Sequence, residues 1–223
     1  MVPAKWSVSP EIFAAHLDWL RELAFNPVTM GQVLAQFQGG RRLPPRAVCL
    51  HFDDARAGFW NTALGMLRRA GVPATLYAVP GWIDGRVPVP EGEQYGGLMT
   101  WAQLREVAAD PLMEVGCHGD SHRNLRRVPR GSLHSEISGA RGILEDRLQR
   151  EVVHFAPPYN RVDARVRSAV RCAGYGTLSA GGGGLNGHFA SRFRVRRILV
   201  NARFARESLL RIASQLGPSA ETA

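Results

Sequence analysis

Lysine is almost absent from this chain. Lys5 is the only one, so arginine supplies nearly all of the positive charge behind the formal net charge of +9. A large positive field attracts anions, which would suit an acidic polymer or an anionic surface as a partner. A GC-rich coding sequence explains the same bias without a partner, and we favour that explanation. The arginines are not interleaved with aromatics in a recognition motif, so we expect no nucleic-acid partner.

Cysteines and long apolar runs are also scarce. Cys49, Cys117 and Cys172 form an odd set without CxxC spacing, from which we expect no disulfide. No apolar stretch reaches the roughly 18 residues of a membrane span, and no signal-peptide pattern is visible. As written, the chain is therefore expected to be cytoplasmic or peripheral, without an integral membrane segment. Its compartment and its oligomeric state stay open.

The length of 223 residues fits one domain with a full apolar core. Helical and strand patterns alternate, which favours a parallel sheet or barrel with right-handed crossovers. We expect 81–97 to form a long loop over one rim, and 217–223 to be a disordered tail. The expected helices span about 11–24, 30–37, 59–70, 100–108, 131–150, 164–173 and 206–216, and the expected strands span about 47–52, 74–79, 112–117, 151–155, 175–179 and 194–200.

Polar or rigid residues follow three of the expected strands. Asp53 and Asp54 follow the first, a His-Gly-Asp-Ser-His segment (118–122) follows the second, and Ala-Pro-Pro-Tyr-Asn (156–160) follows the third. In βα-repeat folds the working site lies at the C-terminal ends of the strands. Neighbouring residues on a strand point to opposite faces, so both carboxylates can serve one site only from the strand end or the following loop. An ordinary Asp pair that caps the next helix is the simpler alternative.

His118 and His122 are four residues apart, a spacing that places two imidazoles on one face of a helical turn, where they can share one ion. Two histidines with one carboxylate are a common ligand set of catalytic zinc. A structural histidine pair is the alternative, and the nearby carboxylates favour the metal. The segment lacks the glutamate of the HExxH signature, which disfavours a metalloprotease of that type. The glycine run at 181–184 lacks the GK[ST] ending of a phosphate loop.

Three segments, 52–54, 118–122 and 155–159, resemble in order and spacing the motifs of the polysaccharide deacetylase family, the NodB-homology group. Flanking segments match as well, and the resemblance covers roughly residues 9–200. It implies a distorted (β/α) barrel of about seven strands with a short N-terminal helical lead-in. The expected boundaries are 1–45 for the lead-in packed on the barrel, 46–216 for the deacetylase-like catalytic domain and 217–223 for the tail.

The resemblance also implies roles for individual residues. Asp53 is then the general base, and Asp54, His118 and His122 are the ligands of a divalent metal, most simply Zn²⁺, with Co²⁺ or Ni²⁺ as alternatives. The backbone N–H of Tyr159 would help to hold the oxyanion. Pro157 and Pro158 would keep this donor rigid before reaction, as electrostatic preorganisation requires, and with Tyr159 they would line the substrate site.

The sequence departs from the family pattern at several positions. His51 and Ala55 replace the usual Thr and Gly around the first motif, and Ala156 replaces an arginine that orients the base. Some biofilm-type deacetylases of N-acetylglucosamine polymers also lack that arginine. The general-acid histidine expected near the last strand is missing from Ile198-Leu199-Val200-Asn201. His188 is our candidate substitute, with His51 and His154 as further candidates.

The resulting hypothesis is a metal-dependent hydrolase that removes N-acetyl groups from an amino-sugar polysaccharide or its precursor. Such an enzyme acts on carbon–nitrogen bonds other than peptide bonds, and its partner is an N-acetylated glycan. Two alternatives stay open. The chain could be a catalytically weak or inactive glycan-binding or assembly protein on the same fold, or an O-acetyl esterase or small-amide hydrolase.

Overall fold

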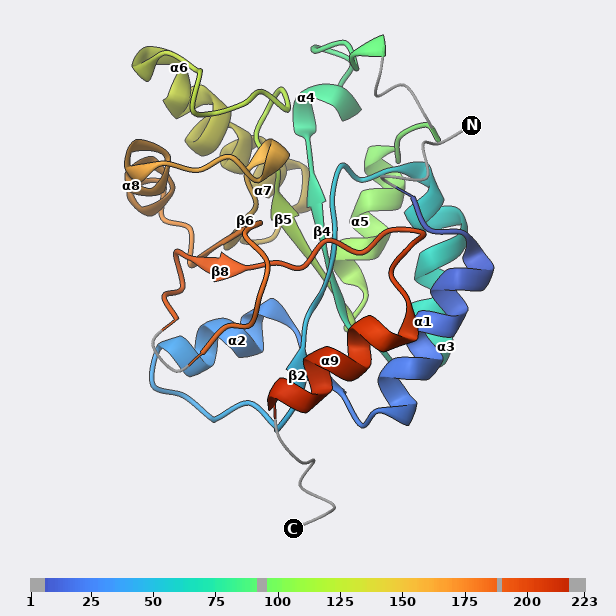
Figure 1. The fold of residues 1–223 in the computed structure, drawn as a ribbon. Coiled ribbons are helices and arrows are strands. Elements are labelled where there is room, and N and C mark those ends of the chain that lie inside the picture. The colour runs from blue at the N-terminus through green and yellow to red at the C-terminus, as the bar shows by residue number, and fades with distance from the viewer. Residues whose placement is uncertain (1–6, 92–95, 188–189, 217–223) are drawn as a thin grey trace.

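The computed structural model describes residues 7–91, 96–187 and 190–216. Six parallel strands in the order β3-β4-β5-β6-β7-β8 form a curled sheet covered by helices (Figure 1), which confirms the distorted barrel. The elements in chain order are α1 (Pro10–Glu22), β1 (Asn26–Pro27), α2 (Met30–Phe37), β2 (Ala47–Val48), β3 (Leu50–Phe52), η1 (Phe59–Ala63), α3 (Leu64–Ala70), β4 (Ala74–Ala78), α4 (Pro80–Ile83), α5 (Trp101–Ala109), β5 (Met113–Cys117), α6 (Arg130–His134), η3 (Ser135–Gly139), α7 (Ala140–Leu148), β6 (His154–Phe155), η4 (Pro158–Asn160), α8 (Ala164–Cys172), β7 (Thr177–Ala180), β8 (Val195–Arg196) and α9 (Arg206–Leu216).

All strand pairs of the large sheet run parallel, with Leu50 opposite Ala74 and Ala74 opposite Met113. Their C-terminal ends therefore lie at one edge, which is the upper edge in Figure 1, near α4. A second parallel pair, β1 with β2, forms a separate two-stranded sheet, whose strand β2 directly precedes β3 in the chain. Among the described strands, β3 and β8 are the two ends of the six-stranded order and do not pair with each other. The barrel thus has an open seam between β3 and β8.

Side chains alternate along the strands between the helical shell and the barrel interior. The outward ones, such as Leu76, Val115 and Leu178, belong to the main apolar core. The inward ones are unusually polar and contact one another: Thr75 donates to Glu114 at 3.1 Å, and His154 pairs with Thr177 at 2.9 Å. The barrel interior is therefore lined by hydrogen-bonded polar groups rather than by apolar side chains, because buried polar groups need hydrogen-bond partners.

Glu114 also fixes α2 across the lower end of the barrel. Its two carboxylate oxygens accept the backbone N–H groups of Met30 and Gly31 at 2.8 and 2.9 Å. These are the first two residues of α2, whose N–H groups have no partner within the helix, and a carboxylate there suits the helix dipole. On the outside, α9 packs on α1 through a small cluster of Leu20, Phe25, Leu209 and Ala213.

Several element boundaries differ from expectation. The helix predicted over 59–70 begins with the π-turn η1, and the predicted loop begins with a short helix, α4. The strands predicted over 151–155 and 194–200 shrink to β6 and β8, because the flanking residues leave the sheet. None of the helices in the described ranges has the length and apolarity that a bilayer crossing needs. The 217–223 segment lies outside the described residues, and the domain boundaries stay a prediction.

Candidate active site

The backbone turns sharply just after β3 and brings both carboxylates to one site. Asp54 and Ala55 adopt left-handed conformations, with φ of 75° and 50°. Such values are uncommon outside glycine, although Asp tolerates them better than most residues. The turn removes the strand alternation that would otherwise send Asp53 and Asp54 to opposite faces. Oxygens of Asp53 and Asp54 lie 3.8 and 3.7 Å from Nε2 of His118.

His118 and His122 come together through a loop after β5, not through the helical turn that their spacing suggested. Gly119 and His122 have φ of 79° and 53°, and the two imidazole centroids lie 5.2 Å apart. Buried Glu136, on the π-turn η3, holds this loop from behind. Its carboxylate accepts the N–H of Ser121 at 3.1 Å and also the Ser121 hydroxyl, and its carbonyl accepts the N–H of Asp120 at 3.2 Å. Nothing in the 118–122 sequence pointed to Glu136.

The donor set of Asp54, His118 and His122 fits a divalent metal. One ligand atom from each lies within 4.8 Å of the other two. His118 Nδ1 lies 2.7 Å from the carbonyl oxygen of Ala156, which can only accept, so the proton is on Nδ1 and Nε2 is free to act as a ligand. Burial, together with His118, lowers the pKa of His122 to about 3, which keeps its imidazole neutral. Buried Asp54 Oδ1 has no hydrogen-bond partner among the described residues. A cation would satisfy these groups together.

Arg197, at the end of β8, forms a bidentate ion pair with Asp53. Its Nη1 and Nη2 lie 2.7 and 3.0 Å from the two carboxylate oxygens. Burial alone would raise the pKa of Asp53, but the charge of Arg197, the charges of His118 and His51 and the Arg197 hydrogen bonds together outweigh burial and hold the pKa below its usual range. The arginine missing at Ala156 thus has a counterpart on another strand. Sequence reasoning missed it because nothing distinguishes Arg197 from its neighbours Arg192, Arg194 and Arg196 until the register of β8 is known.

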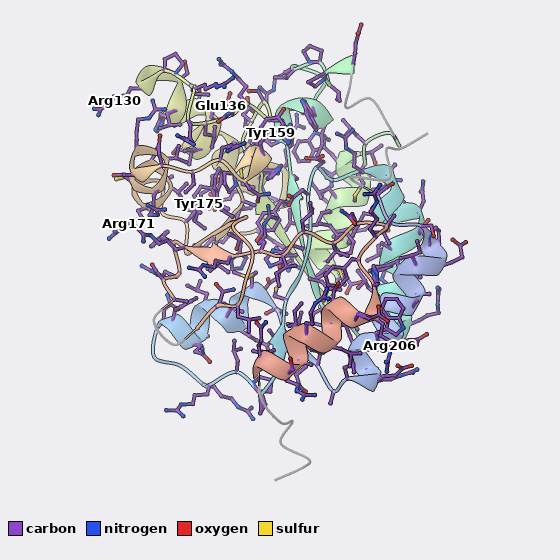
Figure 2. The ribbon with its side chains drawn as sticks, in the orientation of Figure 1. Arg130, Glu136, Tyr159, Arg171, Tyr175 and Arg206 are labelled. Atoms are coloured by element: carbon purple, nitrogen blue, oxygen red, sulfur yellow. The ribbon has the colours of Figure 1, made fainter. Side chains whose placement is uncertain are left out.

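The turn after β6 presents Tyr159 beside the metal ligands. Pro157 and Pro158 are buried, whereas Tyr159 is 49% exposed, and its ring centroid lies 4.8 Å from that of His122. Tyr159 and Asn160 both have left-handed backbone conformations, with φ of 57° and 55°. Figure 2 labels Tyr159 and Glu136 in the upper part of the molecule, the end at which the strands terminate.

Trp82 and Arg56 form one wall of the site. Trp82, on the unexpected helix α4, lies with its ring centroid 4.5 Å from that of His122, and the Arg56 guanidinium lies 4.9 Å above the indole. Arg56 also contacts Asp54 at 3.4 Å. The only sequence signal for this wall is that Trp82 follows a buried strand by four residues.

The alternative acid candidates lie in the barrel interior. His51 stacks on Tyr77, with Nδ1 3.1 Å from the phenol oxygen, and burial followed by the charge of Arg197 lowers its pKa to about 3. His154 is buried between Thr177 and Glu114. Burial lowers the pKa of His154 as well, and the hydrogen bonds of both imidazoles are to groups inside the barrel rather than to the metal-ligand cluster. His188 lies outside the described residues, so its role stays a prediction.

These features define a class of protein: a (β/α) barrel with a candidate metal centre and an adjacent carboxylate at the C-terminal ends of its strands. The chain belongs to the polysaccharide deacetylase family, since the sequence model of that family matches residues 40–178. This finding confirms the family resemblance.

Proteins with similar sequences include deacetylases from two bacteria. The chain is 32% identical over 135 residues to the poly-β-1,6-N-acetyl-D-glucosamine N-deacetylase of Escherichia coli K12, a match that covers 57% of this chain and only 20% of that protein. It is 23% identical over 128 residues to the enzyme of the same name from Staphylococcus aureus, covering 57% of this chain and 42% of that one.

Solved structures share the fold. A Streptococcus pyogenes deacetylase, PplD, in complex with acetate matches with a TM-score of 0.81 at 18% identity, covering 95% of this chain and 88% of that one. A de-N-acetylase from Aggregatibacter actinomycetemcomitans also gives 0.81, at 21% identity, covering 92% and 89%.

Proposed function

We propose that this protein hydrolyses N-acetyl groups on an amino-sugar polymer, with a β-1,6-linked N-acetylglucosamine chain as the first candidate. The observation that carries the proposal is the carboxylate of Asp53, held by Arg197, beside the three-ligand cluster of Asp54, His118 and His122. The names of the Escherichia coli and Staphylococcus aureus relatives support the polymer. Because the match spans a fifth of the Escherichia coli protein, that substrate is part of the proposal.

Asp54, His118 and His122 would hold a divalent ion, and imidazole nitrogens with a carboxylate suit Zn²⁺ best. Such an ion, when bound, supplies Lewis acidity and lowers the pKa of water at the site.

The residues of the chain perform the remaining work. Asp53, held by Arg197, accepts a proton from the attacking water, and a new carbon–oxygen bond forms at the acetyl carbon. The backbone N–H of Tyr159, on its proline-fixed turn, donates to the oxyanion. The carbon–nitrogen bond then breaks, acetate leaves with the new oxygen, and the nitrogen departs as an amine carrying the proton that Asp53 collected.

The test combines metal analysis with one isosteric substitution. We expect near-stoichiometric zinc, cobalt or nickel in the purified protein and none in His118→Ala after identical handling. Asp53→Asn should retain the metal and lose at least about 100-fold in the rate of acetate release from acetylated poly-glucosamine oligomers, because no base is left. Metal binding with unchanged acetate release in Asp53→Asn would contradict the assigned base.

One observation favours a second function, a glycan-binding protein with little turnover. Neither His51 nor His154 is placed to protonate a leaving amine, so the described residues supply no histidine acid. Tight binding of acetylated oligomers with no acetate release under zinc, cobalt or nickel would support this function over the hydrolase.

A further inference from the structure

Asn160 lies at the meeting point of several strand ends, although the family resemblance assigns it no role. Its side-chain oxygen Oδ1 accepts the backbone N–H of Gly181 at 2.7 Å and Nη2 of Arg197 at 2.8 Å. Gly181 directly follows β7, and Arg197 directly follows β8. Asn160 itself closes the turn that presents Tyr159. One amide oxygen therefore joins three segments, an arrangement we call the Asn160 bridge.

The same guanidinium that contacts Asn160 also holds the base. Arg197 Nη2 carries two hydrogens, of which one goes to Asp53 at 3.0 Å and the other to Asn160. Nη1 makes the second contact to Asp53, at 2.7 Å. The backbone N–H of Arg197 is bonded to the carbonyl of Ala180 at 2.9 Å, so the residue is fixed at both ends. A rigid planar fork held in this way leaves Asp53 little rotational freedom.

The local backbone supports the bridge at a conformational cost. Two consecutive non-glycine residues, Tyr159 and Asn160, take left-handed conformations, each costing on the order of 1 kcal/mol or more, although Asn bears the smaller share. A Cβ at position 181 would lie 2.8 Å from Cγ of Asn160, so only glycine permits this close approach. Such strain persists only where the surroundings enforce it.

We propose that Asn160 is a positioning residue that couples the turn of Tyr159, and so the oxyanion donor, to the Arg197–Asp53 pair. The inference rests on the proposed deacetylase function for its kinetic part, and on geometry alone for its structural part. The base and the oxyanion donor must be placed correctly at the same moment, and the bridge ties their positions together. Small misplacements of reacting groups cost large factors in rate.

Three substitutions at this position separate the side chain from the backbone. Asn160→Gly keeps the left-handed conformation and removes the acceptor. Asn160→Asp keeps a side-chain oxygen acceptor and tolerates the left-handed backbone conformation. Asn160→Ala removes the acceptor and disfavours that conformation. We expect kcat to fall roughly 10- to 100-fold in the Gly and Ala variants, with KM changed less than about threefold and metal content unchanged. The Asp variant should recover at least about a third of the parent kcat.

Hydrogen exchange gives a readout that needs no activity. In the parent and in Asn160→Asp, the amide of Gly181 should be protected, and in Asn160→Gly it should exchange at least about tenfold faster. Unchanged protection of the Gly181 amide in Asn160→Gly, or a kcat in that variant equal to that of the parent, would overturn the inference. Faster exchange in Asn160→Gly than in the parent, together with a parent that releases no acetate, would leave the bridge standing and refute the proposed function instead.

Discussion

At the scale of single residues, His51 is a half-buried imidazole whose pKa is lowered in the folded protein. It stacks on Tyr77 beneath the base, and Arg197, Asp53 and His154 are the charged or titratable groups that influence it most. Its pKa of about 3 in the folded protein lies below the value of about 6.5 expected for an unfolded chain. Between these two values the unfolded state binds a proton that the folded state does not, so the free energy of unfolding falls as the pH falls.

The prediction concerns His51→Gln, which cannot be protonated. Between pH 7 and pH 5, the parent should lose up to about 2 kcal/mol more unfolding free energy than this variant does. Urea denaturation at both pH values, in the presence of a chelator, measures the difference. Exposed His134→Gln is the matched control and should keep the parent slope. Equal slopes for His51→Gln and the parent would show that folding does not lower the pKa of His51, because the folded and unfolded states would then bind the same number of protons there.

The residues that sequence could and could not reveal differ in what brings them to the site. Asp53, Asp54, His118 and His122 follow strand ends directly, so local pattern and strand polarity were enough to bring them together. Arg197, Glu136 and Trp82 reach the site only through the register of β8, the placement of η3 and the unexpected helix α4. Such placements depend on packing between elements distant in sequence, which no local pattern records.

At the scale of elements, the 118–122 loop depends on η3 behind it. The π-turn lets Glu136 reach Ser121 with its carboxylate and Asp120 with its carbonyl.

The strands β6 and β8 lie where apolar runs in the sequence predicted them, but they are shorter than predicted. An apolar run does not show where the hydrogen bonds of a sheet end. The positions of these elements in the chain were predictable from the sequence, whereas the hydrogen bonds between them, such as those from the 118–122 loop to Glu136, were not.

Glu136→Gln tests this support. An amide donor would face the Ser121 N–H or hydroxyl, so the loop should loosen, and zinc affinity should fall by about tenfold or more. Competition with a chromogenic chelator measures the affinity. Glu106→Gln, an identical change on the exposed face of α5, should leave the affinity within about twofold. An unchanged affinity in Glu136→Gln would mean that the loop holds its geometry without this carboxylate.

At the scale of the whole molecule, a ligand that binds only the folded state stabilises it by mass action. Zinc at 100 times its dissociation constant should add about 2.7 kcal/mol, which for a chain of this size raises Tm by roughly 5–11 °C. Calorimetry with zinc and then with excess chelator measures the shift. His118→Ala should show a shift of less than about 2 °C. An equal shift in both proteins would place the ion elsewhere.

The open seam between β3 and β8 gives Asp53 a second duty. No ladder joins these strands in the described structure, yet the Arg197–Asp53 ion pair spans the gap between their ends. The atoms that serve chemistry and the atoms that close the barrel are then the same. A substitution that removes the charge of Asp53 to suit a new substrate would also remove the ion pair that spans the seam. Evolutionary drift in this chain should therefore be tolerated in the rim around the site long before it is tolerated at the seam.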